Sequence, residues 1–470
     1  MKTKNNTKRC RLRCLVFHLI AASVIIIGGC ATYYSKNIKL FRAIETGQFE
    51  TANKLLEKDS KAAKGRNNLL HFLNRGYVSW MLNDNKQAVN FLNTAERIID
   101  DHIRLNIGAE ALALVTNPMM KPYRAEDFEV VLVNCFKAIN FMQMEDYEAA
   151  MVECRRINLK LNQLNDRHPD HKNRYQRDAF AHTMMGLLYD TNGDYNNAFI
   201  AYRNALDVYE NDYVPNFNVQ PPQQLKRDIL RTAHLVGFRE ELDFFERKFG
   251  MKYTHTTPPE AELIFFWMNG FGPVKDEWSV NFTIIRGQGG IITFANEGLG
   301  LSFPFPAMGS DGDGAFSDLR LIRVAFPKYA ERRPTSLRAT ISSETATIPL
   351  ERAQDINAIA FKTLDDRFMR EMGSSLLRVA TKQALEQAAR KGDQNLGAIL
   401  GIMNAVTEKA DTRNWQSLPH TISYARIPLK TGNNRLNLNV SMTNGRTVSS
   451  DVSVQAQRGK SYFQVFHTLN

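Results

Sequence analysis

The stretch Gly186–Ala198, GLLYDTNGDYNNA, places a small residue at each end and the turn-forming sequence Asn192-Gly193-Asp194 between them. Apolar residues before and after this turn recur at helical spacing through Tyr209. Asn, Gly and Asp interrupt a helix, and two helices can cross closely only where their side chains are small. The stretch therefore predicts two short helices packed as an antiparallel hairpin.

Three other segments repeat this arrangement of a turn followed by alanine. They are Gly47–Ala52, Asn83–Ala88 and Glu145–Ala150. The pattern resembles the tetratricopeptide repeat, in which small residues 12 positions apart lie where the two helices of a unit cross. Gly76 with Ala88, Ala138 with Ala150, and Gly186 with Ala198 fit that spacing.

The spacing of the units predicts an irregular array. The alanines that mark the units, Ala52, Ala88, Ala150 and Ala198, are 36, 62 and 48 residues apart, whereas regular units repeat every ~34 residues. Extra segments are therefore expected around 103–123 and 164–175. A further stretch of helical spacing, 225–249, extends the array toward the middle of the chain.

The resemblance implies a curved α-solenoid whose first helices line a concave face, a surface on which such arrays often bind an extended peptide. This gives a candidate partner-binding groove that consists of Leu73, Tyr77, Trp80, Ile139 and Met142. Aromatic anchors such as Tyr77 and Trp80 give a large contact area at low entropic cost. The alternative is that both aromatic residues pack against the inserted segments.

The C-terminal half changes character after a linker at 253–260 that contains Thr-Thr-Pro-Pro. Short apolar and β-branched runs predict strands, with Ala261–Met268 as a buried strand. Helical spacing then returns over 355–391 and 395–409, and four strands follow. We expect an α+β multidomain protein. It consists of a tetratricopeptide-like solenoid over 30–252 and a β-sandwich-like domain over 260–470 with a two-helix insertion at 355–410. Two small β domains are the alternative to one sandwich.

The N-terminus has the features of a secretory signal. Six basic residues and no acidic one precede an apolar run, Leu15–Ile27, which ends in Gly28-Gly29-Cys30. The run is shorter than the ~20 residues that span a bilayer. Small residues directly before a cysteine resemble a bacterial lipoprotein signal, which implies that residues 1–29 are removed and Cys30 is lipidated. By the same resemblance, Ala31 after the cysteine favours the outer membrane, with the protein facing the periplasm.

The net charge and the cysteines bear on the class of ligand and on the presence of a disulfide. The formal charge of +11 includes the six basic residues of the signal, so 54 basic residues remain against 49 acidic ones. No long basic block survives, and nucleic-acid binding is not expected. Cys135 and Cys154 remain besides the lipidated cysteine. In an oxidising compartment they form either a disulfide or a pair of buried thiols.

The motifs favour no enzymatic chemistry. We expect no catalytic residue, no metal and no cofactor. The Asp311-Gly312-Asp313 loop does not have the ligand spacing of an EF-hand, and His168 and His171 have no third ligand nearby in the sequence. The apolar, small-residue stretch 397–406 predicts either close helix packing or contact with a membrane or partner.

Four further segments carry a second resemblance: Tyr147–Arg156, Asn269–Glu277, Ala410–Pro419 and Ala425–Leu429. They resemble a family of Gram-negative outer-membrane lipoproteins with tetratricopeptide-like repeats. Genes of that family often lie beside the gene for the lipoprotein activator of a penicillin-binding protein. The resemblance implies an envelope scaffold with envelope protein partners, in a role connected to peptidoglycan synthesis.

An alternative function uses the β domain. A glycan-binding or glycan-processing envelope protein would present Trp267, Trp278 or Trp415 as a platform on which a sugar ring stacks. The sequence Asp411, Arg413 and Trp415 fits either such a recognition patch or a structural ion pair covered by an indole, and we favour the structural ion pair.

Overall fold

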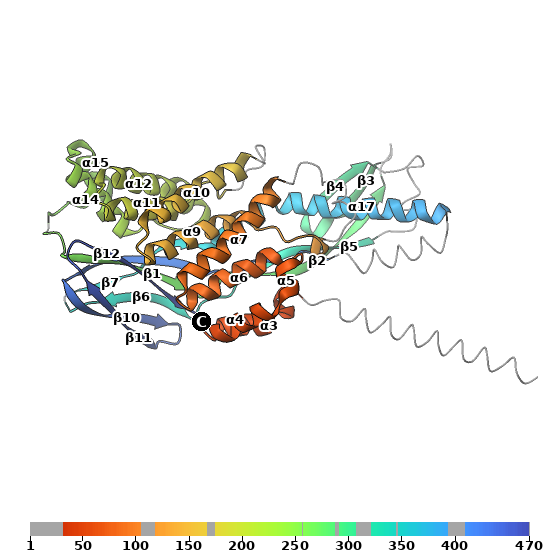
Figure 1. Cartoon of the computed structure of the whole chain (residues 1–470). Coiled ribbons are helices and arrows are strands. Elements are labelled where there is room, and N and C mark those ends of the chain that lie inside the picture. The colour runs from red at the N-terminus through yellow and green to blue at the C-terminus, as the bar shows by residue number, and fades with distance from the viewer. Residues whose placement is uncertain are drawn as a thin grey trace, which may run out of the picture.

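A computed structural model describes residues 32–104, 118–166, 174–255, 257–286, 291–306, 321–344, 346–392 and 409–469. In these ranges helices occupy the N-terminal half and most strands the C-terminal half (Figure 1). Several sequence-based predictions lie outside the described residues. They are the signal segment with Cys30, the Asp311-Gly312-Asp313 loop, the His168 and His171 pair, and the stretch 397–406.

The predicted helical hairpins are confirmed. The pairs are α3 (Ile38–Glu45) with α4 (Phe49–Lys58), α6 (Asn68–Met81) with α7 (Asn85–Arg104), α9 (Asp127–Gln143) with α10 (Tyr147–Asp166), α11 (Ala179–Thr191) with α12 (Tyr195–Val208), and α14 (Gln223–Val236) with α15 (Arg239–Phe249). Shorter helical elements connect or precede them: α2 (Tyr33–Lys36), α5 (Ser60–Lys64), η3 (Pro118–Met120), η4 (Tyr209–Tyr213) and α13 (Val214–Phe217).

One local geometry recurs at the hairpin turns. The backbone is left-handed at Gly47, Asn83, Glu145 and Gly193. In three of the turns the next residue is an aspartate, whose carboxylate accepts a hydrogen bond from a backbone N–H of the following helix. The distances are 3.0 Å for Asp84 to Gln87, 3.1 Å for Asp146 to Ala149 and 3.1 Å for Asp194 to Asn197. These are N-caps of the second helices.

The small residues of the repeat lie where the sequence pattern places them. A methyl group added to Gly186 would overlap the ring of Tyr202 on the partner helix. A methyl group on Gly76 would lie 2.7 Å from Leu92. Close helix crossing therefore depends on glycine in both units.

Eight strands form two of the sheets. Sheet A has the order β12-β1-β9-β8 and sheet C the order β11-β10-β6-β7. The bounds are β1 (Ala261–Asn269), β6 (Ser336–Ser342), β7 (Thr347–Pro349), β8 (Glu351–Asp355), β9 (Thr421–Leu429), β10 (Gly432–Met442), β11 (Thr447–Ala456) and β12 (Ser461–Thr468). The last strand, β12, pairs in parallel with β1, the first.

Sheet A is buried on both faces. On β1, Leu263 and Phe265 point into a core shared with sheet C, whereas Ile264 and Phe266 point into a core shared with the helices. Successive side chains of a strand point to opposite faces, so a strand that is apolar at both sets of positions needs cover on both sides. Helices, sheet A and sheet C therefore form three layers, and sheets A and C confirm the predicted sandwich.

Sheet B, with the order β4-β3-β2-β5, is built separately against one helix. Its strands are β2 (Val274–Arg286), β3 (Ile291–Asn296), β4 (Leu301–Pro306) and β5 (Leu321–Ala330), with η5 (Glu297–Leu299) between β3 and β4. Phe282 and Phe326 of this sheet pack on Met372 and Leu376 of α17 (Phe368–Gly392). We call sheet B together with α17 the arm. Figure 1 shows the arm projecting from one end of the molecule.

Of the two helices predicted for the insertion, the second, 395–409, lies outside the described residues except for residue 409, and the first differs from the prediction. In place of one helix over 355–391, α16 (Ile356–Asp366) ends and α17 begins two residues later. Arg367 lies at the break, and its guanidinium pairs with the buried Glu126 of the helical half. A long-range ion pair therefore interrupts a segment whose local spacing is continuous.

Candidate partner-binding site

The five residues predicted to line an open groove lie in the interior. Leu73, Tyr77 and Ile139 are fully buried, and Met142 and Trp80 are 1% and 3% exposed. The indole N–H of Trp80 donates to Gln143 at 2.6 Å, and the hydroxyl of Tyr77 lies 2.8 Å from Nδ1 of His467 on β12. Tyr77 is therefore in contact with the β domain through His467.

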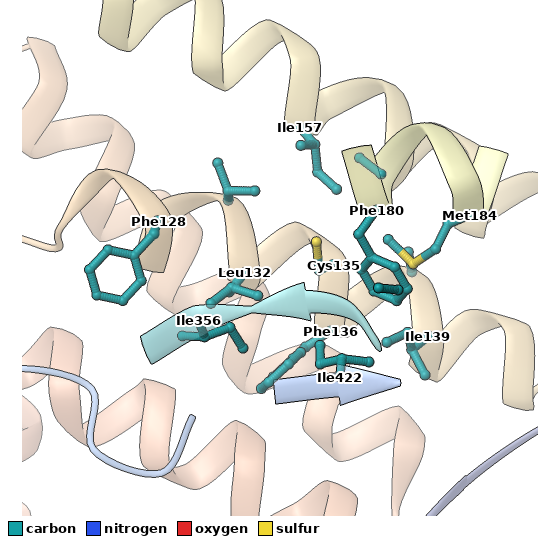
Figure 2. Packing of buried hydrophobic residues seen from close by; sticks show 14 of the residues in the cluster. Phe128, Leu132, Cys135, Phe136, Ile139, Ile157, Phe180, Met184, Ile356 and Ile422 are labelled. Atoms are coloured by element: carbon teal, nitrogen blue, oxygen red, sulfur yellow. The ribbon is translucent and has the colours of Figure 1, made fainter. Parts of the chain in front are cut away.

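The cover of this groove is the chain's own sheet A. Figure 2 shows Phe136 and Ile139 of α9 packed near Ile422 of β9, with Phe180 and Met184 of α11 in the same cluster. The expectation of an open groove at these residues is corrected: the concave face is filled by a β-sheet from the same molecule. The sequence signal for this cover was that β1 is apolar at the positions of both its faces.

A buried charge network fastens the sheet to the helices. Arg426 of β9 donates to Asp190 of α11 at 2.7 Å, to the Tyr202 hydroxyl at 3.0 Å and to Glu262 of β1 at 3.1 Å. Arg231 of α14 pairs with the same Asp190.

The pKa values in this network follow from burial and pairing. Burial alone would raise the pKa of Asp190, but the Arg426 and Arg231 guanidiniums hold it at about 2. The pKa of Asp228 is raised by burial, although Arg426 opposes the shift. The network therefore joins sheet A to the helices through charged groups that are largely shielded from water.

A second buried network lies where the arm joins the helices. Glu126, the residue before α9, pairs with both Lys275 of β2 and Arg367. Burial would raise its pKa, but these two cations hold it at about 2. Glu129, one turn later, accepts from the backbone N–H of Trp415 at 2.6 Å and from Tyr123. Burial and the neighbouring Glu126 raise the pKa of Glu129 to about 7.

The residues Asp411, Arg413 and Trp415 have a structural role. Arg413 is 1% exposed and donates to Asp411 at 2.6 Å and to the carbonyls of Pro118 and Lys121 at 3.1 and 3.0 Å. Trp415 is buried beside Phe136, and its indole N–H donates to Ser417 at 2.8 Å. The structural ion pair with a covering indole is the arrangement that the structure shows.

The two cysteines of the helical half are free thiols on α9 and α10, and both are fully buried. Burial raises the pKa of Cys135 and of Cys154 well above the usual thiol value. Both are therefore protonated and poorly reactive at neutral pH.

The tryptophans considered for glycan stacking are not exposed platforms. Trp267 is 3% exposed and its indole N–H donates to Thr468 at 2.8 Å. Trp278 is half-buried between Phe326 and Phe368. With Trp415 also buried, none of the three presents a free ring face to a sugar.

Within the described ranges, no group of three or more His, Cys, Asp or Glu side chains could hold a metal ion. In the same ranges no helix is long and apolar enough to cross a membrane. A shallow pocket of about 350 Å³ lies between α3 and α4, lined by Ile38, Arg42, Gln48 and Leu55 among others.

One family model matches the sequence, a tetratricopeptide repeat at residues 181–212. This range covers the α11–α12 hairpin except for the first two residues of α11. A search of curated proteins found no match. Together with the five hairpins of the structure, this match defines the N-terminal half as a tetratricopeptide-like region, the class of fold that serves as a scaffold for protein–protein interaction.

Solved structures match part of this chain at low identity. The protein MamA matches at 16% identity over 46% of this chain and 92% of its own, with a TM-score of 0.29. The apo form of RapI matches at 15% identity over 46% and 71%, with a TM-score of 0.31. Aspartyl phosphate phosphatase F from Bacillus subtilis matches at 12% identity over 49% and 52%, with a TM-score of 0.32.

Proposed function

We propose that this protein is an outer-membrane lipoprotein that faces the periplasm and acts as a protein scaffold in cell-envelope assembly. Peptidoglycan synthesis is the process to which the family resemblance points. The observation that carries the proposal is the tetratricopeptide-like array of five helical hairpins, one of which matches the family model of the repeat, in a chain whose N-terminus resembles a lipoprotein signal.

The scaffold role is supported by the way the two halves are joined. The helices share one core and a buried charge network with sheet A, and a second buried charge network joins the helices to sheet B. Such a body holds its outer surfaces in fixed relative positions, which suits a platform for assembling partners. The concave face is already occupied, so a partner must bind elsewhere.

The outer side of α10 is the surface we propose for a protein partner. Val152 and Leu159 are 45% and 60% exposed and lie seven residues apart, on one face of the helix. Arg155 and Arg156 lie between them and are also exposed. Exposed apolar side chains with arginine are typical of protein interfaces. Figure 1 shows α10 on the side of the array away from sheet A.

Crosslinking in intact cells, followed by capture of the protein and mass spectrometry, tests this function. The test variant is Val152→Glu with Leu159→Glu. The matched control is Val448→Glu on β11, which is 51% exposed. Trp80→Ala is unsuitable because Trp80 is buried and its loss would disturb folding.

We expect a cell-wall synthase or its lipoprotein activator to be enriched with the wild type and the control, and lost with the α10 variant. Recovery of sugar-linked fragments without a stoichiometric protein would contradict the scaffold proposal and favour the glycan-binding alternative.

A further inference from the structure

A basic surface lies near Tyr33, the first residue of α2. The N–H of Tyr33 donates to Thr412 at 3.2 Å. The adjacent Arg413 holds the carbonyls of Pro118 and Lys121. Arg66 contacts the sulfur of Met120 at 2.9 Å, and its carbonyl accepts from Tyr123. Residue 33, the turn at 118–124 and the end of α5 are therefore neighbours.

We call this surface the exit surface and define it by Lys61, Lys64, Arg66, Met120, Lys121 and Arg124. Lys61, Lys64, Arg66 and Arg124 are exposed, and none of these four forms an ion pair with an acidic side chain of the described residues. Burial lowers the pKa of Lys121, and the nearby guanidiniums of Arg378 and Arg124 act in the same direction. Helix α5 contributes no buried residue, so both of its lysines are open to solvent.

An apolar side chain lies within the basic surface. Met120 is 65% exposed, the highest value among the large hydrophobic residues of the described chain. Basic side chains around an exposed apolar one form a combination that suits a membrane surface. The cations attract anionic headgroups, and the apolar group enters the boundary with the acyl chains.

The length of chain before the exit surface indicates which membrane this is. Tyr33 lies three positions after Cys30, and an extended chain spans at most ~3.6 Å per residue. A lipid on Cys30 therefore holds Tyr33 within roughly 11 Å of the bilayer, close to the Debye length of ~10 Å at 0.1 M salt. Attraction of the nearby exit surface to anionic headgroups is only partly screened at such distances.

We propose that the exit surface docks on the anionic phospholipid of the membrane that holds the Cys30 anchor, and so fixes the orientation of the scaffold. This inference rests on the proposed lipidation. With the exit surface against the membrane, the folded body is held flush with the bilayer and does not swing on its tether.

The test uses the full-length protein, expressed in a Gram-negative host, purified with its lipid and reconstituted into vesicles that contain phosphatidylglycerol and nitroxide-labelled lipid. A fluorophore is attached to Met120→Cys or, as the matched control, to Val448→Cys on β11. The native Cys135 and Cys154 are buried and do not compete for the label. Intact mass establishes whether the protein carries acyl chains.

We expect the label at Met120→Cys to be quenched roughly threefold more than the label at Val448→Cys. The charge-reversal variant Lys61→Glu, Lys64→Glu, Arg66→Glu should lower the quenching to the control level. The matched variant Lys430→Glu, Arg446→Glu, Arg458→Glu, at exposed positions of the β domain, should leave it unchanged.

The possible results distinguish the proposed lipid anchor from the proposed docking surface. Equal quenching at both positions in a protein of acylated mass would overturn the docking surface and leave the lipoprotein intact. Quenching that survives the charge reversal would overturn the role of the basic residues. A mass without acyl chains would overturn both the anchor and the docking that depends on it.

Discussion

At the scale of single residues, His467 is a half-buried neutral imidazole. Its Nδ1 accepts from Tyr77 and its Nε2 donates to the carbonyl of Gly270 at 2.7 Å. Burial lowers its pKa to about 4 from an ordinary value of 6.5. Because the folded-state pKa lies below the unfolded value, the neutral ring stabilises the fold above pH 6.5, and this contribution is lost as the pH falls toward 4.

From that shift we expect His467 to account for a loss of about 2 kcal/mol in the free energy of unfolding between about pH 7.5 and 5. In His467→Gln the amide can replace both hydrogen bonds but does not titrate, so its pH dependence should be smaller by that amount. Urea unfolding of both proteins at the two pH values measures the difference. Identical pH dependence would show that His467 is not responsible.

The two cysteines give a second prediction at this scale. Because Cys135 and Cys154 are buried, protonated thiols, both should stay unmodified when the native protein is treated with an alkylating reagent. Both should be alkylated when the protein is denatured without a reductant. Peptide mass spectrometry distinguishes the two states. A peptide pair linked through these two cysteines, in protein isolated from cells without reductant, would show the disulfide instead.

At the scale of helices and strands, the small residues of the repeat can be tested by a pair of substitutions of opposite sign. Gly186→Ala drives a methyl group into the Tyr202 ring and should destabilise the protein by ~1–3 kcal/mol. Gly373→Ala, in α17 with open space around it, should stabilise by ~0.5–1 kcal/mol because alanine is the better helix former. Thermal unfolding compares them. If Gly186→Ala is the more stable variant, the helices do not cross at this position.

The charge network that joins β9 to α11 and α14 gives another prediction. Arg426→Ala leaves buried carboxylates, among them Asp190, without their main cation and should lower the free energy of unfolding by ~3–5 kcal/mol. Arg435→Ala, at an exposed position of β10, is the matched control and should change it by less than ~0.5 kcal/mol. Similar values for the two variants would mean that the network does not hold the sheet to the helices.

The sequence predicted the helical hairpins more completely than the strands. The hairpins were predictable because turn, cap and small residues lie within about a dozen positions of one another. Two strands were not predicted, β4 and β8, and both are edge strands. β4 contains Pro304 and Pro306, which an edge strand tolerates, and β8 is short and mostly polar. The break at Arg367 depends on Glu126, more than 200 residues away.

At the scale of the whole molecule, the candidate groove was the prediction that the sequence could not settle. Helical spacing placed Tyr77 and Ile139 on the first helices, but their exposure depends on where β1, β9 and β12 lie. The parallel pairing of Ile264 with Phe463 joins segments about 200 residues apart, and no local pattern specifies it. The signal present was the apolar character of β1 on both faces, which requires a second covering layer.

The central claim is that the tetratricopeptide-like array and sheet A form a single core. Hydrogen exchange of the intact chain, followed by mass spectrometry across a urea series, tests this claim most directly. Peptides from α6, α9, β1 and β9 should lose protection together, with one free energy of opening. Peptides from sheet B and α17, which have their own core, can open separately. If β1 and β9 open at low urea while α6 and α9 stay protected, the concave face is a separable interface and the single-core account is contradicted.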